Sequence, residues 1–438
     1  MHSSSKDQFR PIQYLGNKSR LLDVIASAME SVAAPGARVA DLFSGTSVVG
    51  RRLAARNPVT AVDVQGYAAA LGRAMLLTSS SDLAAFDEQR FLERASDAHE
   101  RLRGEFEPLI EREKRAVSDL RKGQVAAMEG IIEGGSIISQ AATGRPLPPI
   151  LRSMVEGVND SLPDATAAVS FGGVYFSYDQ ALWLDALHHA TRSEPQAIRD
   201  VLIAAILGTC SEIVNTVGKQ FAQPVRLSDR QGDPKPLLIG RTLRDRGLDV
   251  RQRFVACVAR WRSASAGGSP RNRVAQMDVD TFMRSSEPWD AAYADPPYTI
   301  DHYSRFYHVL ETLVRRDRPN LSRMKREGVP TIMRGLYRDD RYQSDFCVPS
   351  QAPGAFARLF EAAAHRRAPL VLSYSGHAEA DEQRARLLSI DDLARLARQS
   401  FRSVEIATPA FEGHRKLNAA RRNATTEAGS ERLLICRS

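Results

Sequence analysis

The segment from Ala294 to Tyr303, ADPPYTIDHY, places two consecutive prolines behind an acid and ahead of an aromatic residue. Proline has no backbone N–H and its φ is held near roughly −65°, so Asp295-Pro296-Pro297-Tyr298 cannot continue a central strand or enter a helix interior. The residues before it, WDAAYA, have a strand pattern that ends at Asp295. The Asp295 carboxylate, the Pro296 carbonyl and the Tyr298 ring should therefore project together at a sheet edge.

Acceptors without donors, next to an aromatic ring, suit the amino group of a planar base. Adenine N6 is a poor nucleophile because its lone pair is delocalised into the ring. Asp295 and the Pro296 carbonyl can accept both N6 hydrogens and favour a more tetrahedral nitrogen, whose lone pair then points at an incoming methyl group. Tyr298 would stack on the base, and Pro297 would help to stiffen the loop. The alternative is a plain Pro-Pro turn after an edge strand.

A second candidate site lies in VADLFSGTSVVG, from Val39 to Gly50. A strand ending in Asp41, then Phe43 and Gly45, then a helix start places a tight turn at the carboxyl edge of a sheet. The turn lacks the glycines and the lysine of phosphate-binding loops. Asp63 ends the next predicted strand, where a carboxylate can accept hydrogen bonds from both hydroxyls of a ribose. The alternative is that Asp41 and Asp63 only cap helices.

These motifs need a parallel sheet to position them. The strand, turn, helix and strand order of the first eighty residues is half of a doubly wound nucleotide-binding sheet. From about Ser80 the chain becomes charged and helical, residues 134–163 have loop composition, and SASAGGSPRN resembles a linker. Strand candidates then resume in RVAQMDV, WDAAYADPP, VPTIMRG, APLVLSYS and ERLLICRS. We therefore predict an α/β sheet formed by residues 1–80 and 270–438, interrupted by a mainly helical insertion at 81–269.

Composition limits the class of protein. The 438 residues carry a formal net charge of +8, which suits a polyanionic partner. No apolar run is long enough to cross a bilayer and the first residues lack the core of a signal peptide, so we expect an intracellular, cytoplasmic protein without a membrane partner. The four cysteines show no metal-binding spacing and are expected to be reduced structural thiols, and no metal site is predicted.

Four segments together resemble DNA adenine N6-methyltransferases of the Dam-like D12 class, and in particular the bacterial restriction-modification branch. They are QYLGNKSRLL, DLFSGTSVVG, DPPY and HYSRFYHVLETL, with further likenesses in VYFSYDQALWLDAL, IVNTVGKQF and LVLSYSGH. The resemblance implies a Rossmann-like fold, S-adenosylmethionine as the cofactor and double-stranded DNA as the substrate. It also implies a cognate restriction enzyme as a further partner.

The resemblance also implies roles for individual residues. Tyr14 and Lys18 would reach the methionine end of the cofactor, with Lys18 suited to its carboxylate. Asp41, Phe43 and Gly45 would line the cofactor pocket, Asp63 would bind the ribose, and Asp278 would accept from the cofactor's adenine amino group. Asp280 is the competing candidate for that role, because two residues apart on an extended chain face the same side. The catalytic group would be Asp295, Pro296, Pro297 and Tyr298.

One departure from the family's pattern concerns the glycine turn. The family's turn is usually F-x-G-x-G, and here Ser47 replaces the second glycine. We expect the helix to start there, with Ser47 at the N-cap position, which serine favours. In HYSRFYHVLETL, Tyr303, Phe306, Tyr307 and Leu310 have the spacing of a core face that braces the catalytic loop. His302 and His308 are expected at a loop or on the helix surface and not as bases.

An adenine in duplex DNA must be extruded before its N6 can react. Candidate phosphate contacts follow the predicted catalytic helix, and their alternative is a solvated charged face: Arg315, Arg316, Arg318, Arg323, Lys325 and Arg326. A second basic cluster is GRTLRDRGLDVRQR. Base reading would fall to the insertion, where Asn215 and Gln220 are candidate readers. The charged helix near residues 85–125 could instead mediate self-association as a homodimer.

Three functions compete on this evidence. The leading prediction is a site-specific DNA adenine N6-methyltransferase. Cytosine N4 methylation needs the same grip on an exocyclic amine, and Asp at position 295 favours adenine. A catalytically inactive DNA-binding regulator on the same scaffold is the third reading, against which the intact Tyr14, Lys18, Asp63, Asp295 and Tyr298 argue.

Overall fold

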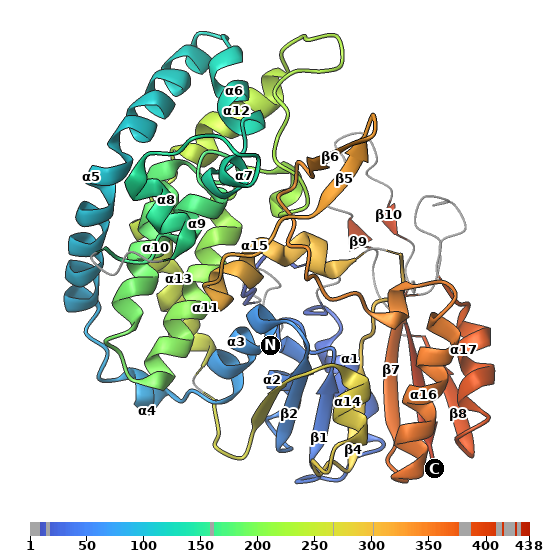
Figure 1. The fold of residues 1–438 in the computed structure, drawn as a ribbon. Helices are drawn as coiled ribbons and strands as arrows, with labels where there is room; N and C mark the ends of the chain where they lie inside the picture. The colour runs from blue at the N-terminus through green and yellow to red at the C-terminus, as the bar shows by residue number, and fades with distance from the viewer. Residues whose placement is uncertain are drawn as a thin grey trace.

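The protein is built on a seven-stranded sheet with the strand order β3-β2-β1-β4-β7-β11-β8 (Figure 1). The computed structural model describes residues 9–14, 18–157, 162–265, 267–300, 302–375, 387–408, 414–415, 425–426 and 431–438. All neighbouring strands run parallel except β11, which is antiparallel to both β7 and β8. The strands are β1 (Val39–Leu42), β2 (Val59–Asp63), β3 (Arg273–Gln276), β4 (Ala291–Ala294), β7 (Leu370–Ser375), β8 (Ser403–Ala407) and β11 (Glu431–Arg437).

Helices cover both faces of this sheet, so the half of the protein that contains it has three layers. Alternate side chains of each strand enter separate hydrophobic cores: Val39 packs with the helices of one face and Ala40 with those of the other. The first face is covered by α1 (Leu22–Glu30), α2 (Val48–Leu53) and α3 (Gly66–Leu76), and the second by α14 (Val279–Arg284), α16 (Ala352–His365) and α17 (Ile390–Ala397). The predicted Rossmann-like α/β fold is confirmed.

The two central strands bring distant motifs to one edge of the sheet. All residues of β1 and β4 are buried, as expected for strands covered on both faces. Their parallel register pairs Leu42 with Ala294, and the Asp295 N–H continues the ladder by donating to the Leu42 carbonyl at 3.3 Å. Because parallel strands end at the same edge, the residues after β1, β2 and β4 converge there.

Between α3 and β3 the described chain is helical and adds no strand to the sheet. The long helix α5 crosses one side of the molecule (Figure 1). The elements are α4 (Ser80–Leu83), α5 (Glu88–Arg121), α6 (Ala126–Glu133), α7 (Ile137–Ala142), α8 (Pro149–Glu156), α9 (Thr166–Phe171), α10 (Tyr178–Thr191), α11 (Gln196–Ile213), η1 (Val217–Lys219), α12 (Pro236–Arg246) and α13 (Val250–Ala264). The expected loop at residues 134–163 is wrong, because α7 and α8 form there; Pro149 begins α8 and Gly157 is its C-cap, whereas Ser136 and Thr143 flank α7.

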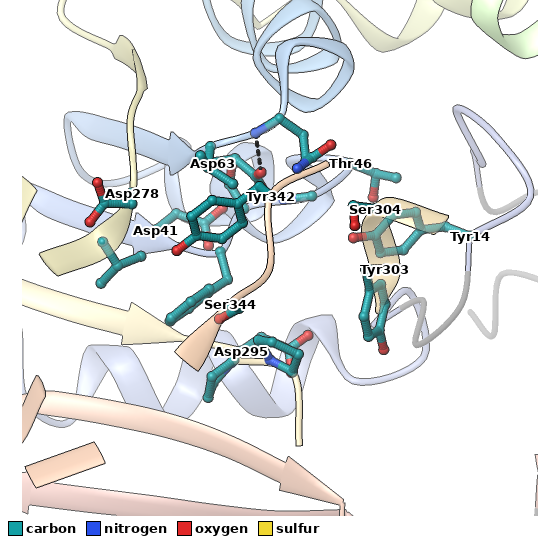
Figure 2. Close-up of a pocket in the computed structure, with 18 of the residues that line it drawn as sticks. Tyr14, Asp41, Thr46, Asp63, Asp278, Asp295, Tyr303, Ser304, Tyr342 and Ser344 are labelled. Atoms are coloured by element: carbon teal, nitrogen blue, oxygen red, sulfur yellow. Dashed lines mark hydrogen bonds between the residues drawn. The ribbon is translucent and has the colours of Figure 1, made fainter. Parts of the chain in front are cut away.

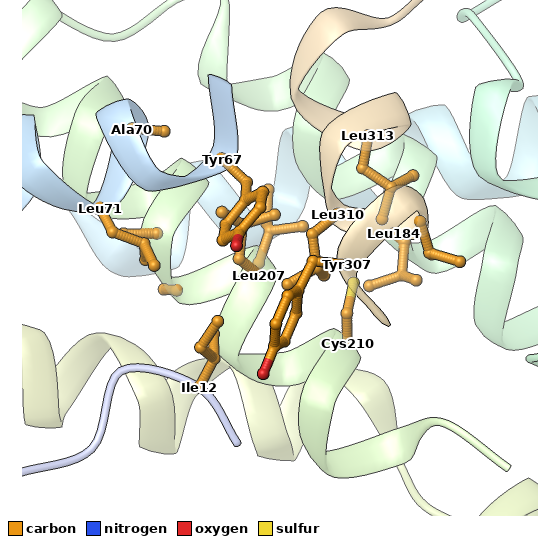
Figure 3. Packing of buried hydrophobic residues seen from close by; sticks show 14 of the residues in the cluster. Ile12, Tyr67, Ala70, Leu71, Leu184, Leu207, Cys210, Tyr307, Leu310 and Leu313 are labelled. Atoms are coloured by element: carbon orange, nitrogen blue, oxygen red, sulfur yellow. The ribbon is translucent and has the colours of Figure 1, made fainter. Parts of the chain in front are cut away.

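These helices share a hydrophobic core with the sheet half. Tyr67 of α3 and Tyr307 of α15 (Tyr303–Arg315) meet Leu207 and Cys210 of α11 in one cluster (Figure 3). Such continuous packing fixes the insertion against α15, the helix that follows the Asp295 loop. That residues 81–269 form a target-recognition domain stays a prediction.

The charged helix α5 uses its apolar stripe within the chain. Phe91, Ala95, Leu102 and Phe106 are fully buried at helical spacing, and α5 packs along α10. This stripe is therefore covered without a second copy of the chain, and self-association through it finds no support. The four cysteines are buried and free, as predicted. None of the described helices has the length and apolar character needed to span a bilayer.

The structure corrects the strand predictions at two points. VPTIMRG does form a strand, β6 (Val329–Ile332), but it pairs only with β5 (Arg323–Arg326) in a separate hairpin. β8 was missed, because Ser403–Ala407 is an exposed edge strand without a buried pattern. The remaining elements are η2 (Asp345–Cys347) and the short pair β9 (His414–Arg415) and β10 (Thr425–Thr426).

Arg316 joins the end of α15 to the insertion. It is the C-cap of α15 with φ 51°, and its Nη1 lies 2.7 Å from Oδ1 of Asp185, which is fully buried. Both Asp185 oxygens also accept backbone N–H groups of α9, from Ala167 and Ala168. The guanidinium is therefore the cation that balances a buried carboxylate.

We expect Arg316→Ala to lower the free energy of unfolding by about 3 kcal/mol, because it leaves the Asp185 carboxylate buried without a cation. Urea denaturation followed by circular dichroism measures this. Arg395→Ala, which removes an exposed pair with Asp392, is the control and should change stability by less than about 0.5 kcal/mol. Equal effects of the two substitutions would contradict a structural role for Arg316.

Candidate active site

A cavity opens at the carboxyl edge of the sheet and encloses about 1080 Å³, counting its open mouth. Every residue predicted for cofactor binding or catalysis lines it: Tyr14, Lys18, Asp41, Phe43, Gly45, Asp63, Asp278, Asp295, Pro296, Pro297 and Tyr298. Figure 2 shows Asp278 at one end, Tyr14 and Tyr303 at the other, and Asp63 and Asp295 on opposite sides. The structure thus brings these residues together, and their individual roles stay predictions.

The turn after β1 is held in a left-handed conformation at three alternate residues. Phe43, Gly45 and Ser47 have φ of 59°, 51° and 56°. At Gly45, a Cβ atom would lie 2.8 Å from the Tyr14 hydroxyl oxygen, so glycine is also needed for space. The turn therefore lets the backbone approach the cavity wall closely.

Ser47 differs from our expectation. It does occupy the N-cap position of α2, but its φ is positive and its hydroxyl makes no capping hydrogen bond. Its Oγ is buried and has no hydrogen-bond partner among the described residues. The position thus retains the backbone requirement of a glycine while carrying a side chain, which costs free energy.

Asp63 holds the turn as well as facing the cavity. Its Oδ2 accepts the Gly45 N–H at 3.0 Å and its Oδ1 accepts the Gln65 N–H at 2.9 Å. Burial raises the pKa of Asp63 to about 6. Asp63 therefore bonds an amide next to α3, as the capping alternative expected, yet each oxygen keeps acceptor capacity toward the cavity.

Asp41 lies in β1 and also bonds the backbone N–H of Gly50 in the first turn of α2, as the capping alternative expected. It is almost fully buried within β1, and its Oδ2 has no hydrogen-bond partner among the described residues. Burial raises the pKa of Asp41 to about 8, so this carboxyl is mostly neutral at pH 7 and can donate a hydrogen bond. A neutral donor and ionisable acceptors thus share one wall.

Asp278 and Asp280 do not face the same side. Asp278 lines the cavity as the N-cap of α14 and accepts the Thr281 N–H at 2.9 Å, whereas Asp280 lies in the first turn of the helix. Asp280 is bonded to Arg358 at 2.9 Å. The assumption of an extended chain was wrong because a helix begins between them, and only Asp278 is placed to meet a ligand.

Lys18 lies between two carboxylates. Its Nζ is 3.1 Å from Asp295 Oδ1 and 3.2 Å from Glu431 Oε1, and its side chain is only 4% exposed. Burial alone would lower the pKa of Lys18, but Asp295 and Glu431 raise it well above its ordinary value. Burial raises the pKa of Asp295 to about 6, while Lys18 opposes this rise and Glu431 adds to it. Glu431 carries no recognisable motif, and sequence reasoning missed it.

Aromatic rings form the wall beside the Asp295 loop. Tyr14 stacks on Tyr307 of α15 with ring centroids 5.0 Å apart, and the Tyr298 ring stands edge-on to Tyr374 at 5.4 Å. Phe306, Tyr307 and Leu310 are buried, which confirms α15 as a core face that braces the loop.

The two histidines near the loop differ from each other. His302, the N-cap of α15, lines the cavity. His308 is buried and not on the helix surface as expected; burial lowers its pKa to about 3, and its Nε2 lies 3.1 Å from the Phe221 carbonyl oxygen. His308 is therefore a neutral core residue, and it is not placed to act as a base.

The segment from Tyr342 to Cys347 completes the cavity and was also missed. Tyr342, Ser344 and Cys347 line it, and Figure 2 shows Tyr342 beside Asp278. Tyr342 is 41% exposed, so its ring covers one end of the cavity from the solvent side. Nothing in the sequence marks this segment, because its approach depends on how α16 packs.

The six predicted phosphate contacts fall into two groups. Arg315, Arg316 and Arg318 are engaged with acids of the protein: Arg315 with Asp317 and Asp340, Arg316 with Asp164 and Asp185, and Arg318 with Asp164. Arg323, Lys325 and Arg326 form strand β5 of the hairpin, where Arg323 and Lys325 are exposed. The side chains of Arg323 and Lys325 therefore lie at the surface of the protein.

The candidate base reader Asn215 is wrong. Its side chain is fully buried, and its Oδ1 accepts a hydrogen bond from Thr242 inside the helical region. In the second basic cluster Arg246 is also buried, where it pairs with Glu113. Within the described part of the chain, no group of three or more acidic, histidine or cysteine side chains is placed to hold a metal ion.

Comparison with known proteins finds a family match in the N-terminal part of the chain. The model of the D12 class N6 adenine-specific DNA methyltransferases matches residues 14–116. The predicted resemblance is confirmed over these residues. Modification methylase LlaI of Lactococcus lactis subsp. lactis is 44% identical over 64 residues, 14% of this chain and 10% of that protein's length. The chain thus spans about a tenth of the curated relative that it matches.

The D12 match contains β1, β2, Tyr14 and Lys18, but it ends in α5. Asp278 and the catalytic loop at Asp295 lie far beyond it. Their connection to the D12 motifs therefore rests on the cavity they share with residues of the matched part.

We expect Ser47→Gly to raise the free energy of unfolding by about 1 kcal/mol. The substitution relieves a left-handed serine and removes a buried unpaired hydroxyl, which together outweigh the added freedom of the unfolded chain. Thermal and urea unfolding measure the change.

The matched control is Ser389→Gly, at a cap with φ −78° whose hydroxyl does bond Asp392. It should lose a few tenths of a kcal/mol. Loss of stability in Ser47→Gly as well would mean that the Ser47 side chain contributes contacts that offset its strain.

Proposed function

We propose that the protein is a site-specific DNA adenine N6-methyltransferase, which transfers a methyl group from S-adenosylmethionine to an adenine flipped out of duplex DNA. One observation carries the proposal: the partly buried Asp295 carboxylate and the donor-free Pro296-Pro297 backbone open into the same cavity as Asp63 and Asp278. A single cavity with an acceptor-only rim and separate acidic ligands suits an amine substrate beside a hydroxyl-rich cofactor.

The chemistry of the cavity fits S-adenosylmethionine. Asp63 offers acceptors for the ribose diol, and Asp278 offers one for the adenine amino group at the far end (Figure 2). The left-handed turn at Gly45 allows close approach of the backbone. The unpaired Oδ2 of Asp41, a mostly neutral carboxyl, supplies a further polar group in this wall. When bound, the cofactor supplies an electrophilic methyl group.

The chain's own residues would prepare the amine. Asp295 and the Pro296 carbonyl accept the two N6 hydrogens, orient the nitrogen and draw its lone pair out of the ring. Pro296 and Pro297 present no N–H that could compete as donors. Tyr298 supports the face of the base, and the proton lost from the methylated nitrogen passes to Asp295 or to solvent. No separate base is required, in keeping with the buried neutral His308.

DNA phosphates would be held by the β5–β6 hairpin. Its turn is closed by Glu327 and Gly328 at φ 52° and 82°, the geometry of a two-residue turn that projects from the surface. In Figure 1 the hairpin projects away from the sheet, above α15. Met324 and Val329 are 52% and 64% exposed beside the basic residues, so the hairpin offers both charge and apolar surface to a nucleic acid. The helical residues 81–269 would supply base reading.

The experiment that tests the activity is transfer of labelled methyl groups to mixed-sequence duplex DNA, followed by nucleoside analysis. We expect N6-methyldeoxyadenosine. N4-methylcytosine would contradict the choice of base, and DNA that is bound but carries no label would point to an inactive regulator.

We expect Asp295→Ala to reduce transfer at least about a hundredfold while changing cofactor affinity little, because it removes an acceptor for the amine. Asp63→Ala should weaken cofactor binding by about tenfold or more, since it removes an acceptor for the ribose and loosens the Gly45 turn. Calorimetric titration with the cofactor and single-turnover kinetics separate the two effects. Equal loss of cofactor affinity in both variants would contradict this division of roles.

We expect Lys325→Ala to weaken DNA binding similarly for all sequences and to reduce the slope of log affinity against log salt by about one. Fluorescence anisotropy across a salt series measures this slope. Lys114→Ala, on the exposed side of α5, is the matched control and should leave it unchanged. An unchanged slope in Lys325→Ala would remove the hairpin from the DNA interface.

A further inference from the structure

The last strand of the sheet places a carboxylate behind the catalytic loop. Glu431 begins β11, which pairs with β7, and β7 pairs with β4, the strand that leads into Asp295. The Glu431 side chain is 12% exposed, and its Oε1 accepts a hydrogen bond from Lys18 Nζ at 3.2 Å. It lies outside the motifs that resemble the D12 class and outside the matched residues 14–116.

Two carboxylates therefore divide one buried ammonium group. Lys18 Nζ lies within 3.2 Å of both, and the three side chains carry one positive and two negative charges when all are ionised. An ammonium group has three hydrogens, so a second partner fixes the direction in which the remaining ones point. Without Glu431, Lys18 could turn fully toward Asp295 or toward a ligand.

We propose that Glu431 is a positioning residue for methyl transfer: it accepts the hydrogen bond of Lys18, so that Asp295 meets the ammonium group only as an ion pair at Oδ1 and its Oδ2 stays available to the substrate amine. The inference rests on the proposed function and adds a residue to it. Lys18 keeps Asp295 ionised, but its positive charge also makes the Asp295 carboxylate a weaker hydrogen-bond acceptor. Glu431 limits this weakening, because it shares the ammonium group.

Such an arrangement has an electrostatic signature. The other groups around Asp295 are Asp41 on β1, Tyr293 on β4, Tyr303 on α15 and the Tyr298 ring, which lies 5.7 Å from Lys18 Nζ. Burial raises the pKa of Asp41 to about 8 and those of Tyr293 and Tyr303 well above their ordinary value. These three stay neutral while Asp295 titrates near its pKa of about 6, so Lys18 and Glu431 are the charges that set the pKa of Asp295.

The Asp295 carboxylate determines the direction in which the acid limb of kcat/KM moves. Asp295 must be ionised to accept from the amine, so kcat/KM should fall as the pH falls through the pKa of Asp295. Glu431 raises the pKa of Asp295 by repulsion between the two carboxylates. When the charge of Glu431 is lost, Lys18 also interacts with Asp295 alone, which lowers the pKa of Asp295 further. Glu431→Gln should therefore move the acid limb to lower pH, by roughly one unit. Lys18→Met should move it to higher pH.

The test is kcat/KM for labelled methyl transfer to duplex DNA, measured from well below to well above the pKa of Asp295. The proteins are the wild type, Glu431→Gln, Lys18→Met and the control Glu405→Gln. Glu405 is an exposed carboxylate on β8, paired with Arg437 at 3.1 Å, and its substitution should leave the limb in place. Glu431→Gln should also lower kcat at neutral pH by several-fold, because Lys18 is no longer oriented.

A loss of activity in Glu431→Gln that is uniform at all pH values, or an acid limb moved to higher pH, would overturn the inference. Glu431→Asp provides a second test that holds if the glutamine variant does not fold. It keeps the charge but withdraws it by one methylene, so the limb should stay near the wild-type position while kcat falls, and a wild-type kcat would overturn the inference. If the wild type is active and the acid limb of Glu431→Gln coincides with that of the wild type, only the role of Glu431 is refuted. A wild type that transfers no methyl group refutes the proposed function.

Discussion

The site depends on keeping a carboxylate charged where water is largely excluded. Moving an ionised Asp from water into a protein interior is costly unless a cation and hydrogen bonds replace its hydration. The Asp295 side chain is 22% exposed and meets this requirement through Lys18, which lies near the N-terminus of the chain. Lys18 is in turn 4% exposed and needs its own compensation, which Asp295 and Glu431 provide together. Three segments that are remote in sequence are thus bound to one another by charge at a single edge of the sheet.

The fold explains why these segments meet there. Parallel strands β1, β2 and β4 end at one edge, so the turn at Gly45, the acid Asp63 and the loop at Asp295 converge without special contacts. The antiparallel strand β11 is the exception. Because it runs against β7, its first residue and not its last lies at this edge, and that residue is Glu431. The helical insertion then holds α15, and with it the loop, through a core shared with α3 and α11.

The sequence predicted the elements and site residues that have a local pattern. The central strands are short apolar runs, and the eleven predicted cofactor and catalytic residues carry motif patterns; all of them line one cavity. It failed where the outcome depends on packing. Glu431 and Tyr342 reach the cavity only because β11 and the segment before α16 pack where they do. Asn215 was predicted as a candidate base reader, but its side chain is fully buried. Arg316 and Arg318 looked like a basic run, while their partner Asp164 lies more than a hundred residues away.

The central claim is that an acceptor-only rim, formed by Asp295 and the Pro296 carbonyl, grips the exocyclic amine of an extruded base. The most direct measurement is a crystal structure of the protein with duplex DNA and the demethylated cofactor. The account predicts an adenine outside the helix, with its N6 within hydrogen-bond distance of both oxygens and its ring against Tyr298. An adenine that stays stacked in the duplex, or an amine that meets neither oxygen while the cofactor occupies the cavity, would contradict it.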